Sequence, residues 1–197
     1  LLLVAVFTAL STGGAIVVSQ YIGRGERENA KRAADQVFIV TLVISLIIMT
    51  ICLCFREFLL NTIFGEMEKR VFDSAMDYFL YISISYPFLA QFNTCSAIFR
   101  ADNKAIIPML ISLGMNVMNV CGNALFIFVF DMEAGGAGLA SMISRAVGFI
   151  VIYILMLVPS RRIGLSAFYK MRTDKVTVGR ILRVGLPTGF ENGIFQI

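Results

Sequence analysis

The chain has 197 residues, of which 58% are hydrophobic and only 15% are charged, and its mean hydropathy is +0.82. Soluble domains carry roughly 25% charged residues, so this composition excludes an ordinary water-soluble protein. The net charge of +4 lies almost wholly in short connections between apolar blocks, which indicates lipid headgroups and not nucleic acid as the partner. Because the chain has no histidine, His-based zinc sites and Ser-His-Asp or Cys-His catalysis are excluded.

Five apolar blocks are long enough to cross a bilayer, which takes about 20 residues. We expect these spans at about residues 1–21, 37–55, 78–99, 105–130 and 139–158, with a sixth beginning near residue 181. A short charged helix outside the hydrocarbon is expected at 26–36, a surface helix within 56–77, and a flexible glycine-rich link at 131–138. The predicted fold class is therefore an all-α membrane protein, a polytopic helical bundle of about five complete transmembrane helices plus the start of a sixth.

Lysine and arginine are concentrated in connections 23–36, 100–104 and 159–180 and are scarce in the other two. By the positive-inside rule these three connections face the cytoplasm, which predicts a multi-pass protein of the inner or plasma membrane. The first residues lie inside an apolar run and the last lie a few residues into another. We interpret the chain as a fragment of a larger protein.

Asn116, Asn119 and Asn123 lie along one face of the predicted fourth span. Amides without partners in hydrocarbon cost several kcal/mol each, so this row is expected to face protein or water. Two interpretations stay open, namely contact with another helix and the lining of a solute path.

A second polar surface follows Pro87 in the third span and consists of Gln91, Asn93, Thr94 and Ser96. The short turn at 100–104 favours packing of the third and fourth spans as neighbours. In that arrangement the two polar surfaces would face each other around a solvated cavity.

Two ionisable residues are expected within the hydrocarbon. Arg145 must pair, reach water or extend its head group to the surface, so its role is either structural or the gating or binding of an anionic group. Glu191 could bind a cation or carry a proton, or it could stay hydrated at the interface. The sequence has no phosphate-binding loop, no acidic metal cluster and no catalytic pair, so neither an enzyme nor a cofactor is expected.

Several segments together resemble the MATE (multidrug and toxic compound extrusion) family of secondary transporters. The similarity is carried, in order along nearly the whole chain, by Ser19-Gln20-Tyr21-Ile22-Gly23, Tyr86-Pro87-Phe88, Ile98-Phe99-Arg100-Ala101, the row Asn116, Asn119 and Asn123, Gly135-Gly136-Ala137-Gly138, Ile143-Ser144-Arg145 and Ile181-Leu182-Arg183-Val184-Gly185-Leu186-Pro187.

The resemblance implies a parent of two six-helix lobes around a central cavity. Residues 1–180 would be most of the N-terminal lobe, without its first helix, and 181–197 the start of the second lobe. The full-length protein would then be a monomer that exports organic cations or drugs against Na+ or H+ by alternating access, in contact with membrane lipids.

The resemblance also implies site residues. The cavity would be lined by Gln91, Asn93, Thr94, Asn116, Asn119 and Asn123. Asn123 stands where some family members have an aspartate implicated in coupling, so Asn123 and Glu191 are the candidates for the coupling ion. Arg145, Pro87 and Pro187 are candidates for structural or gating roles.

Two other functions stay open at this point. A flippase for lipid-linked saccharides would be expected to line its cavity with several cationic residues, whereas Arg145 is the only basic residue deep in a predicted span. A membrane receptor or enzyme has no ligand set or catalytic pair in its favour.

Overall fold

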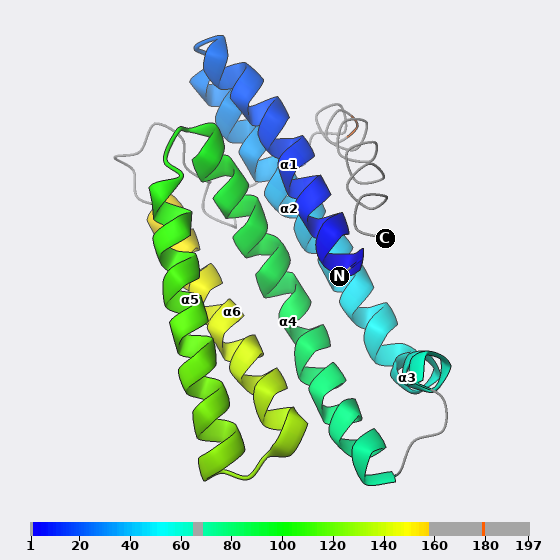
Figure 1. The fold of residues 1–197 in the computed structure, drawn as a ribbon. Helices are drawn as coiled ribbons and strands as arrows, with labels where there is room; N and C mark the ends of the chain where they lie inside the picture. The colour runs from blue at the N-terminus through cyan, green and yellow to red at the C-terminus, as the bar shows by residue number, and fades with distance from the viewer. Residues whose placement is uncertain (1, 65–68, 158–178, 180–197) are drawn as a thin grey trace.

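The computed structural model describes residues 2–64, 69–157 and 179, and all of the regular structure in them is helical. The helices are α1 Leu2–Gly23, α2 Arg27–Cys54, α3 Arg56–Phe64, α4 Lys69–Ala101, α5 Ile106–Ala124 and α6 Glu133–Leu157 (Figure 1). A π-helical segment, η1 Leu125–Val129, continues α5 directly. The predicted all-α class is confirmed.

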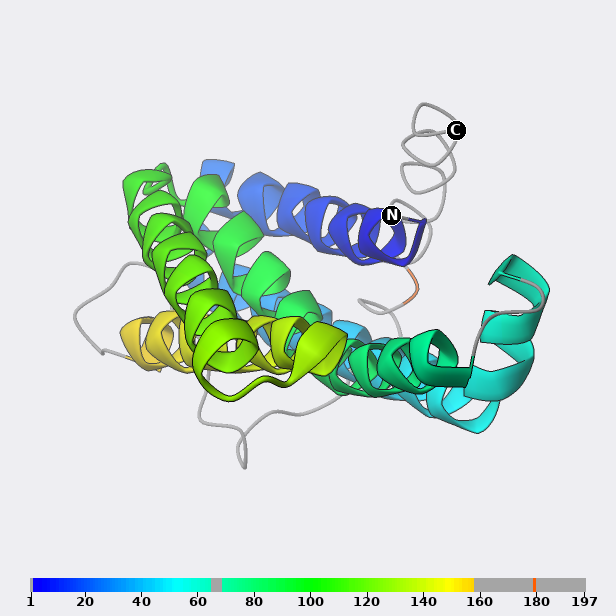
Figure 2. The same cartoon turned by 60° about the horizontal axis from the view of Figure 1, so that its bottom comes forward.

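Four of these helices are long and apolar enough to cross a membrane, over residues 4–23, 27–54, 106–129 and 133–157. The predicted third span lies in α4, whose 33 residues rise about 50 Å, more than a bilayer needs. Because it carries many polar side chains, α4 is not among the four helices that are apolar enough to cross a membrane. It nevertheless runs through the middle of the bundle in Figures 1 and 2.

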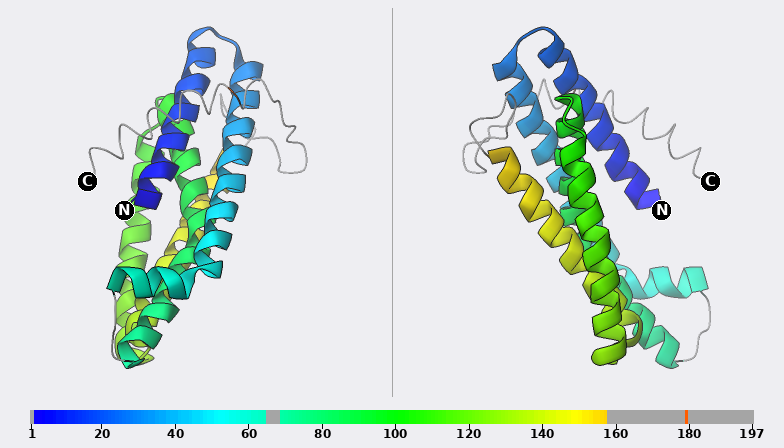
Figure 3. Two further views of the ribbon diagram at one scale, coloured as in Figure 1. Left: turned by 90° about the vertical axis from the view of Figure 1, so that its right-hand side faces the viewer. Right: turned by 60° about the vertical axis from the view of Figure 1, so that its left-hand side comes forward.

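Helix α4 packs against α1, α2 and α6, while α5 packs mainly on α6 and barely touches α4. The largest buried cluster forms where α1, α2, α4 and α6 meet, and includes Val18, Val37, Phe38, Ile98 and Ile152. Helix α3 lies across the end of the bundle at which α2 stops (Figure 3). The expectation that the third and fourth spans are neighbours is therefore wrong, because α6 returns to lie against α4 and separates it from most of α5.

The turns after α1 and α4 lie at one end of the bundle, and the turn between α5 and α6 lies at the other end (Figure 1). The two basic connections that the structure describes therefore share an end, as the positive-inside rule requires. Asn103 has a φ of 59° in the α4–α5 turn, a left-handed conformation that asparagine tolerates better than most residues.

The predicted separate helix at 26–36 does not exist, because α2 continues through it into the apolar segment. One side of this stretch carries Ala30, Ala33, Ala34 and Val37, all fully buried in the main cluster. Arg27, Glu28, Lys31 and Arg32 are exposed, whereas Asp35 is buried, so a single helix with one buried side and mostly exposed charges accounts for this segment.

The glycine-rich segment at 131–138 is also not a flexible link, since α6 already begins at Glu133. A Cβ atom on Gly136 would lie 2.9 Å from the Cβ of Phe126, and one on Gly138 would lie 3.1 Å from the backbone oxygen of Tyr78. These glycines allow α6 to approach η1 and α4 closely, as small residues do between membrane helices.

Candidate functional site

Two polar residues of α6 reach toward different neighbouring helices. Ser141 accepts a hydrogen bond of 3.0 Å from Asn119 Nδ2 on α5. Arg145 Nη1 donates a hydrogen bond of 2.6 Å to Ser85 Oγ on α4. Residues four apart lie on the same face of a helix, so this face of α6 lies between α4 and α5. We call the set Ser85, Asn119, Asn123, Ser141 and Arg145 the polar face.

The amides of the polar face form a chain. Asn123 Nδ2 donates to Asn119 Oδ1 at 3.2 Å, and Asn119 Nδ2 donates to Ser141 Oγ. Asn123 Oδ1 is buried and has no hydrogen-bond partner among the described residues. If both amides were rotated the chain would reverse and leave Asn123 Nδ2 unpaired instead. In either direction one polar atom of Asn123 is left for an additional partner.

The remaining member of the asparagine row is placed differently. The side chain of Asn116 is exposed, and no hydrogen bond joins it to another residue that the structure describes. Asn119 and Asn123 are half-buried against α6. The row thus divides into Asn119, which links α5 to α6, Asn123, which donates to Asn119 within α5, and Asn116, which does neither.

Gln91 and Thr94, two of the polar residues after Pro87 in α4, face α1 and α2 and not the asparagine row. Gln91 Nε2 donates to Phe38 O at 3.3 Å and to Thr41 Oγ1 at 3.4 Å on α2. Thr94 Oγ1 lies 3.0 Å from Thr41 Oγ1 and 3.1 Å from Ser11 Oγ on α1. Gln91 and Thr94 are almost completely buried, because α4 turns this side into the interior of the bundle.

We call Ser11, Thr41, Gln91 and Thr94 the hydroxyl cluster. Each of its three hydroxyls also lies within hydrogen-bond distance of a carbonyl of its own helix, at 2.7 to 3.0 Å. Each hydroxyl has a single proton, so the contacts between hydroxyls and those to carbonyls cannot all be made at once. If Ser11 donates to Thr94, Thr94 to Thr41 and Thr41 to Val37 O, each hydroxyl uses its single proton and the three hydrogen bonds join α1, α4 and α2.

Replacement of Thr94 by valine is expected to destabilise the full-length protein by about 1 kcal/mol, since it removes the hydroxyl that joins α1 to α2. Thermal denaturation in detergent measures the change. Thr50→Val is the matched control, because the exposed Thr50 hydroxyl bonds, among the described residues, only to Leu46 O of its own helix, at 2.8 Å. Equal melting temperatures for the two variants would contradict a bridging role for Thr94.

The other predicted site residues are scattered. Asn93 is half-buried and makes no hydrogen bond with the described residues, and Ser96 Oγ is buried without a partner. Pro87 is buried inside α4, next to the segment that Arg145 contacts through Ser85. Glu191 and Pro187 lie outside the described residues.

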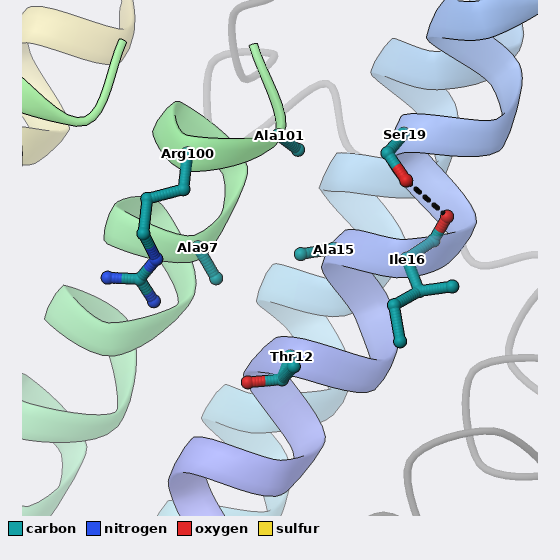
Figure 4. Close-up of a pocket in the computed structure, with 7 residues that line it drawn as sticks. All are labelled: Thr12, Ala15, Ile16, Ser19, Ala97, Arg100 and Ala101. Atoms are coloured by element: carbon teal, nitrogen blue, oxygen red, sulfur yellow. Dashed lines mark hydrogen bonds between the residues drawn. The ribbon is translucent and has the colours of Figure 1, made fainter. Parts of the chain in front are cut away.

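A pocket of about 220 Å³ lies between α1 and α4, near the end that carries the basic turns. In Figure 4, Thr12 and Ala15 of α1 face Ala97 and Ala101 of α4, and the small size of these side chains leaves the space open. Arg100 also lines the pocket, with its guanidinium directed away from α1. This pocket involves none of the polar-face residues.

The sequence pattern did not single out Ser11, Thr41 or Ser85 as partners of the predicted residues. Each lies in a largely apolar stretch, and its partner lies more than 50 positions away along the chain. Within residues 2–64 and 69–157, no group of three His, Cys, Asp or Glu side chains is placed to hold a metal ion. Amide and hydroxyl oxygens are therefore the available cation ligands of the polar face.

Long apolar helices that enclose amide, hydroxyl and guanidinium groups define a polytopic membrane protein. The family model MatE matches residues 1–125, and the chain belongs to this family. MATE proteins are transporters and not enzymes, and the chain is part of a multi-pass protein of the plasma membrane.

Individual relatives agree with this assignment. The chain is 25% identical to the "Uncharacterized transporter YisQ" of Bacillus subtilis, over 96% of this chain and 42% of that protein. It is 28% identical to the "Probable multidrug resistance protein NorM" of Thermotoga maritima, over 97% of this chain and 41% of that protein. The chain therefore spans less than half the length of these relatives.

Solved structures share the fold. Inward-facing and outward-facing structures of a multidrug resistance MATE family transporter of the MOP superfamily each give a TM-score of 0.87 at 21% and 20% identity. They cover 97% of this chain and 43% and 42% of the respective solved chains.

Proposed function

We propose that the full-length protein is a secondary active multidrug efflux transporter that exports organic cations or drugs in exchange for Na+ or H+. The observation that carries this proposal is the polar face, which lies between long helices and ends in an unpaired polar atom of Asn123. Membership of the MATE family and the names of relatives such as "Multidrug export protein MepA" of Staphylococcus saprophyticus support the same function.

The chemistry of the polar face favours Na+ over H+ as the ion that binds there. Asn123 is a neutral amide that cannot carry a proton, and the described part of the polar face contains no carboxylate. Hard cations such as Na+ prefer oxygen ligands, and Asn123 Oδ1 and Ser141 Oγ are oxygens on adjacent helices. A proton would need a carboxylate elsewhere, for which Glu191 is the candidate within this chain.

The proposed mechanism is alternating access by the rocking of two lobes around a central cavity. Residues 1–180 would form most of one lobe and 181–197 the start of the other, in a protein that acts as a monomer. A lobe that moves as a rigid body keeps its internal fold in both states. The equal similarity of this chain to the inward-facing and outward-facing structures supports such a movement.

The test is efflux of a fluorescent organic cation, such as ethidium, from cells that express the full-length gene, with Na+ and pH varied separately. We expect efflux to exceed that of the empty vector and to increase with the inward Na+ gradient at constant pH. Efflux equal to that of the empty vector under every gradient would contradict the transporter. Efflux that follows only the pH gradient would contradict Na+ binding at Asn123.

Asn123→Asp is expected to lower the Na+ concentration for half-maximal efflux about tenfold, because a carboxylate binds a cation more strongly than an amide by more than about 1.4 kcal/mol. Efflux should then also respond to pH, since the new group can take up a proton. Asn116→Asp places the same charge two turns away on an exposed part of α5 and serves as the matched control. The same Na+ dependence in both variants would exclude Asn123 as a ligand.

A further inference from the structure

The pocket between α1 and α4 is a groove with a closed inner side and an open outer side. Three of the residues that line it are alanines, Ala15, Ala97 and Ala101, and their short side chains keep about 220 Å³ free (Figure 4). Ala97 is almost completely buried between the helices, whereas Ile16 and Ser19 are exposed. A ligand can therefore enter the groove from the side of the bundle.

The groove runs along α1 from the end of the bundle toward its middle. Ser19 and Thr12 are seven residues apart, which corresponds to about 10 Å of helix. One leaflet contributes about 15 Å to the hydrocarbon core, so the groove covers much of the depth of a leaflet. The end with Ser19 lies beside Ala101, the last residue of α4. This end carries the basic turns, which the positive-inside rule assigns to the cytoplasm.

Arg100 places a positive charge at the edge of the groove. Its guanidinium is directed away from α1, so it leaves the space between the two helices open (Figure 4). Arg100 forms no ion pair or hydrogen bond with the residues that the structure describes. The carboxylate of Asp102, two positions away, is already paired with Lys104 at 2.6 Å. The guanidinium is therefore available to an anion.

The size of the groove favours an acyl chain over another helix. A helix about 10 Å wide with a pitch of 5.4 Å occupies about 400 Å³ per turn, nearly twice the free volume. An acyl chain is much thinner and carries no polar group. The Ser19 hydroxyl donates to Ile16 O at 2.8 Å, so an apolar chain next to it leaves this donor paired. The cytoplasmic leaflet supplies such chains on negatively charged headgroups.

From these observations we propose that the groove binds an anionic phospholipid of the cytoplasmic leaflet, with the phosphate on Arg100 and one acyl chain between α1 and α4. A guanidinium binds a phosphate through paired, charge-assisted hydrogen bonds. The acyl chain supplies the alanines with dispersion contacts that neither helix provides. The site lies apart from the polar face and does not depend on the proposed exchange of drugs for Na+ or H+.

The test is native mass spectrometry of the purified full-length protein in detergent micelles, with equal amounts of phosphatidylglycerol and phosphatidylcholine that have the same acyl chains. We expect the wild type to bind phosphatidylglycerol about fivefold more tightly, which corresponds to about 1 kcal/mol for one basic residue. In Arg100→Gln this preference should disappear. Arg100→Lys keeps the positive charge and should retain most of the preference.

Two matched controls separate the groove from the surface around it. Arg24→Gln removes an exposed charge at the same end of the bundle that does not line the groove, and it should keep the wild-type preference. Ala15→Leu fills the groove and should weaken the binding of both lipids at least about fivefold. Ala105→Leu adds the same volume at an exposed position outside the groove and should leave the binding unchanged.

Three results would overturn the proposal. Equal binding of the two lipids by the wild type would show that no anionic headgroup is selected. A loss of preference in Arg24→Gln as large as that in Arg100→Gln would indicate diffuse attraction to the basic end. Unchanged binding in Ala15→Leu would place the lipid elsewhere and indicate that another segment of the full-length protein covers the groove. Each of these results leaves the efflux function standing.

Discussion

Replacement of Gly138 by leucine is expected to destabilise the full-length protein by about 3 kcal/mol, the upper part of the range for overpacked interiors. A Cβ atom at this position would lie 3.1 Å from the backbone oxygen of Tyr78, 3.2 Å from its Cα and 3.2 Å from the Cβ of Tyr81. Because backbone atoms cannot rotate away, α6 would have to move from α4. Thermal denaturation and the yield of monodisperse protein measure the effect.

Gly114→Leu is the control for this substitution. Gly114 lies inside α5, and a Cβ atom there would meet no other atom within 4 Å. Leucine forms helices better than glycine, so this variant should be as stable as the wild type or slightly more stable. If Gly138→Leu melted at the same temperature as Gly114→Leu, the close approach of α4 and α6 would not be required for stability.

Replacement of Asn119 by leucine is expected to reduce efflux at least about tenfold, with a loss of stability of about 1 kcal/mol. Asn119 donates to Ser141 and accepts from Asn123. Its loss therefore removes the hydrogen bond between α5 and α6 and the hydrogen bond that orients the Asn123 amide. The efflux rate, normalised to the amount of protein in the membrane, and the melting temperature are the two measurements.

The matched control removes the amide one turn earlier on α5. Asn116→Leu breaks no hydrogen bond between described residues, because the Asn116 side chain is exposed in this part of the chain. Its melting temperature and normalised efflux rate should therefore stay close to those of the wild type. A loss of efflux in Asn116→Leu as large as that in Asn119→Leu would contradict the division of the asparagine row.

Much of the fold follows from the apolar blocks alone. Each block corresponds to one long helix, although α2 begins at Arg27 and α4 at Lys69, well before the expected 37 and 78, and the positive-inside rule predicts which turns share an end of the bundle. The boundaries at 26–36 and 131–138 were wrong for a common reason. Charged residues in α2 and glycines in α6 both suggest a break in the sequence pattern, whereas in the folded protein small residues at these places pack against neighbouring helices.

The candidate site was only partly predictable. The spacing of Asn119 and Asn123 predicts two amides on one face of a helix. Because unpaired amides are costly in hydrocarbon, this face is predicted to contact protein or water and not lipid tails. Which helix contacts these two amides depends on how the spans pack together. The assumption that consecutive spans are neighbours paired α4 with α5, which placed Gln91 and Thr94 opposite the asparagine row instead of against α1 and α2.

The sequence by itself determined the class of the protein, the approximate positions of its helices and the polar residues that must avoid lipid, because each of these depends on local composition and on period. Only the tertiary structure decided that Asn119 meets Ser141, that Arg145 is held by Ser85, and that Thr94 joins α1 to α2. These contacts depend on close approaches between helices that are distant along the chain, and no local spacing encodes such an approach.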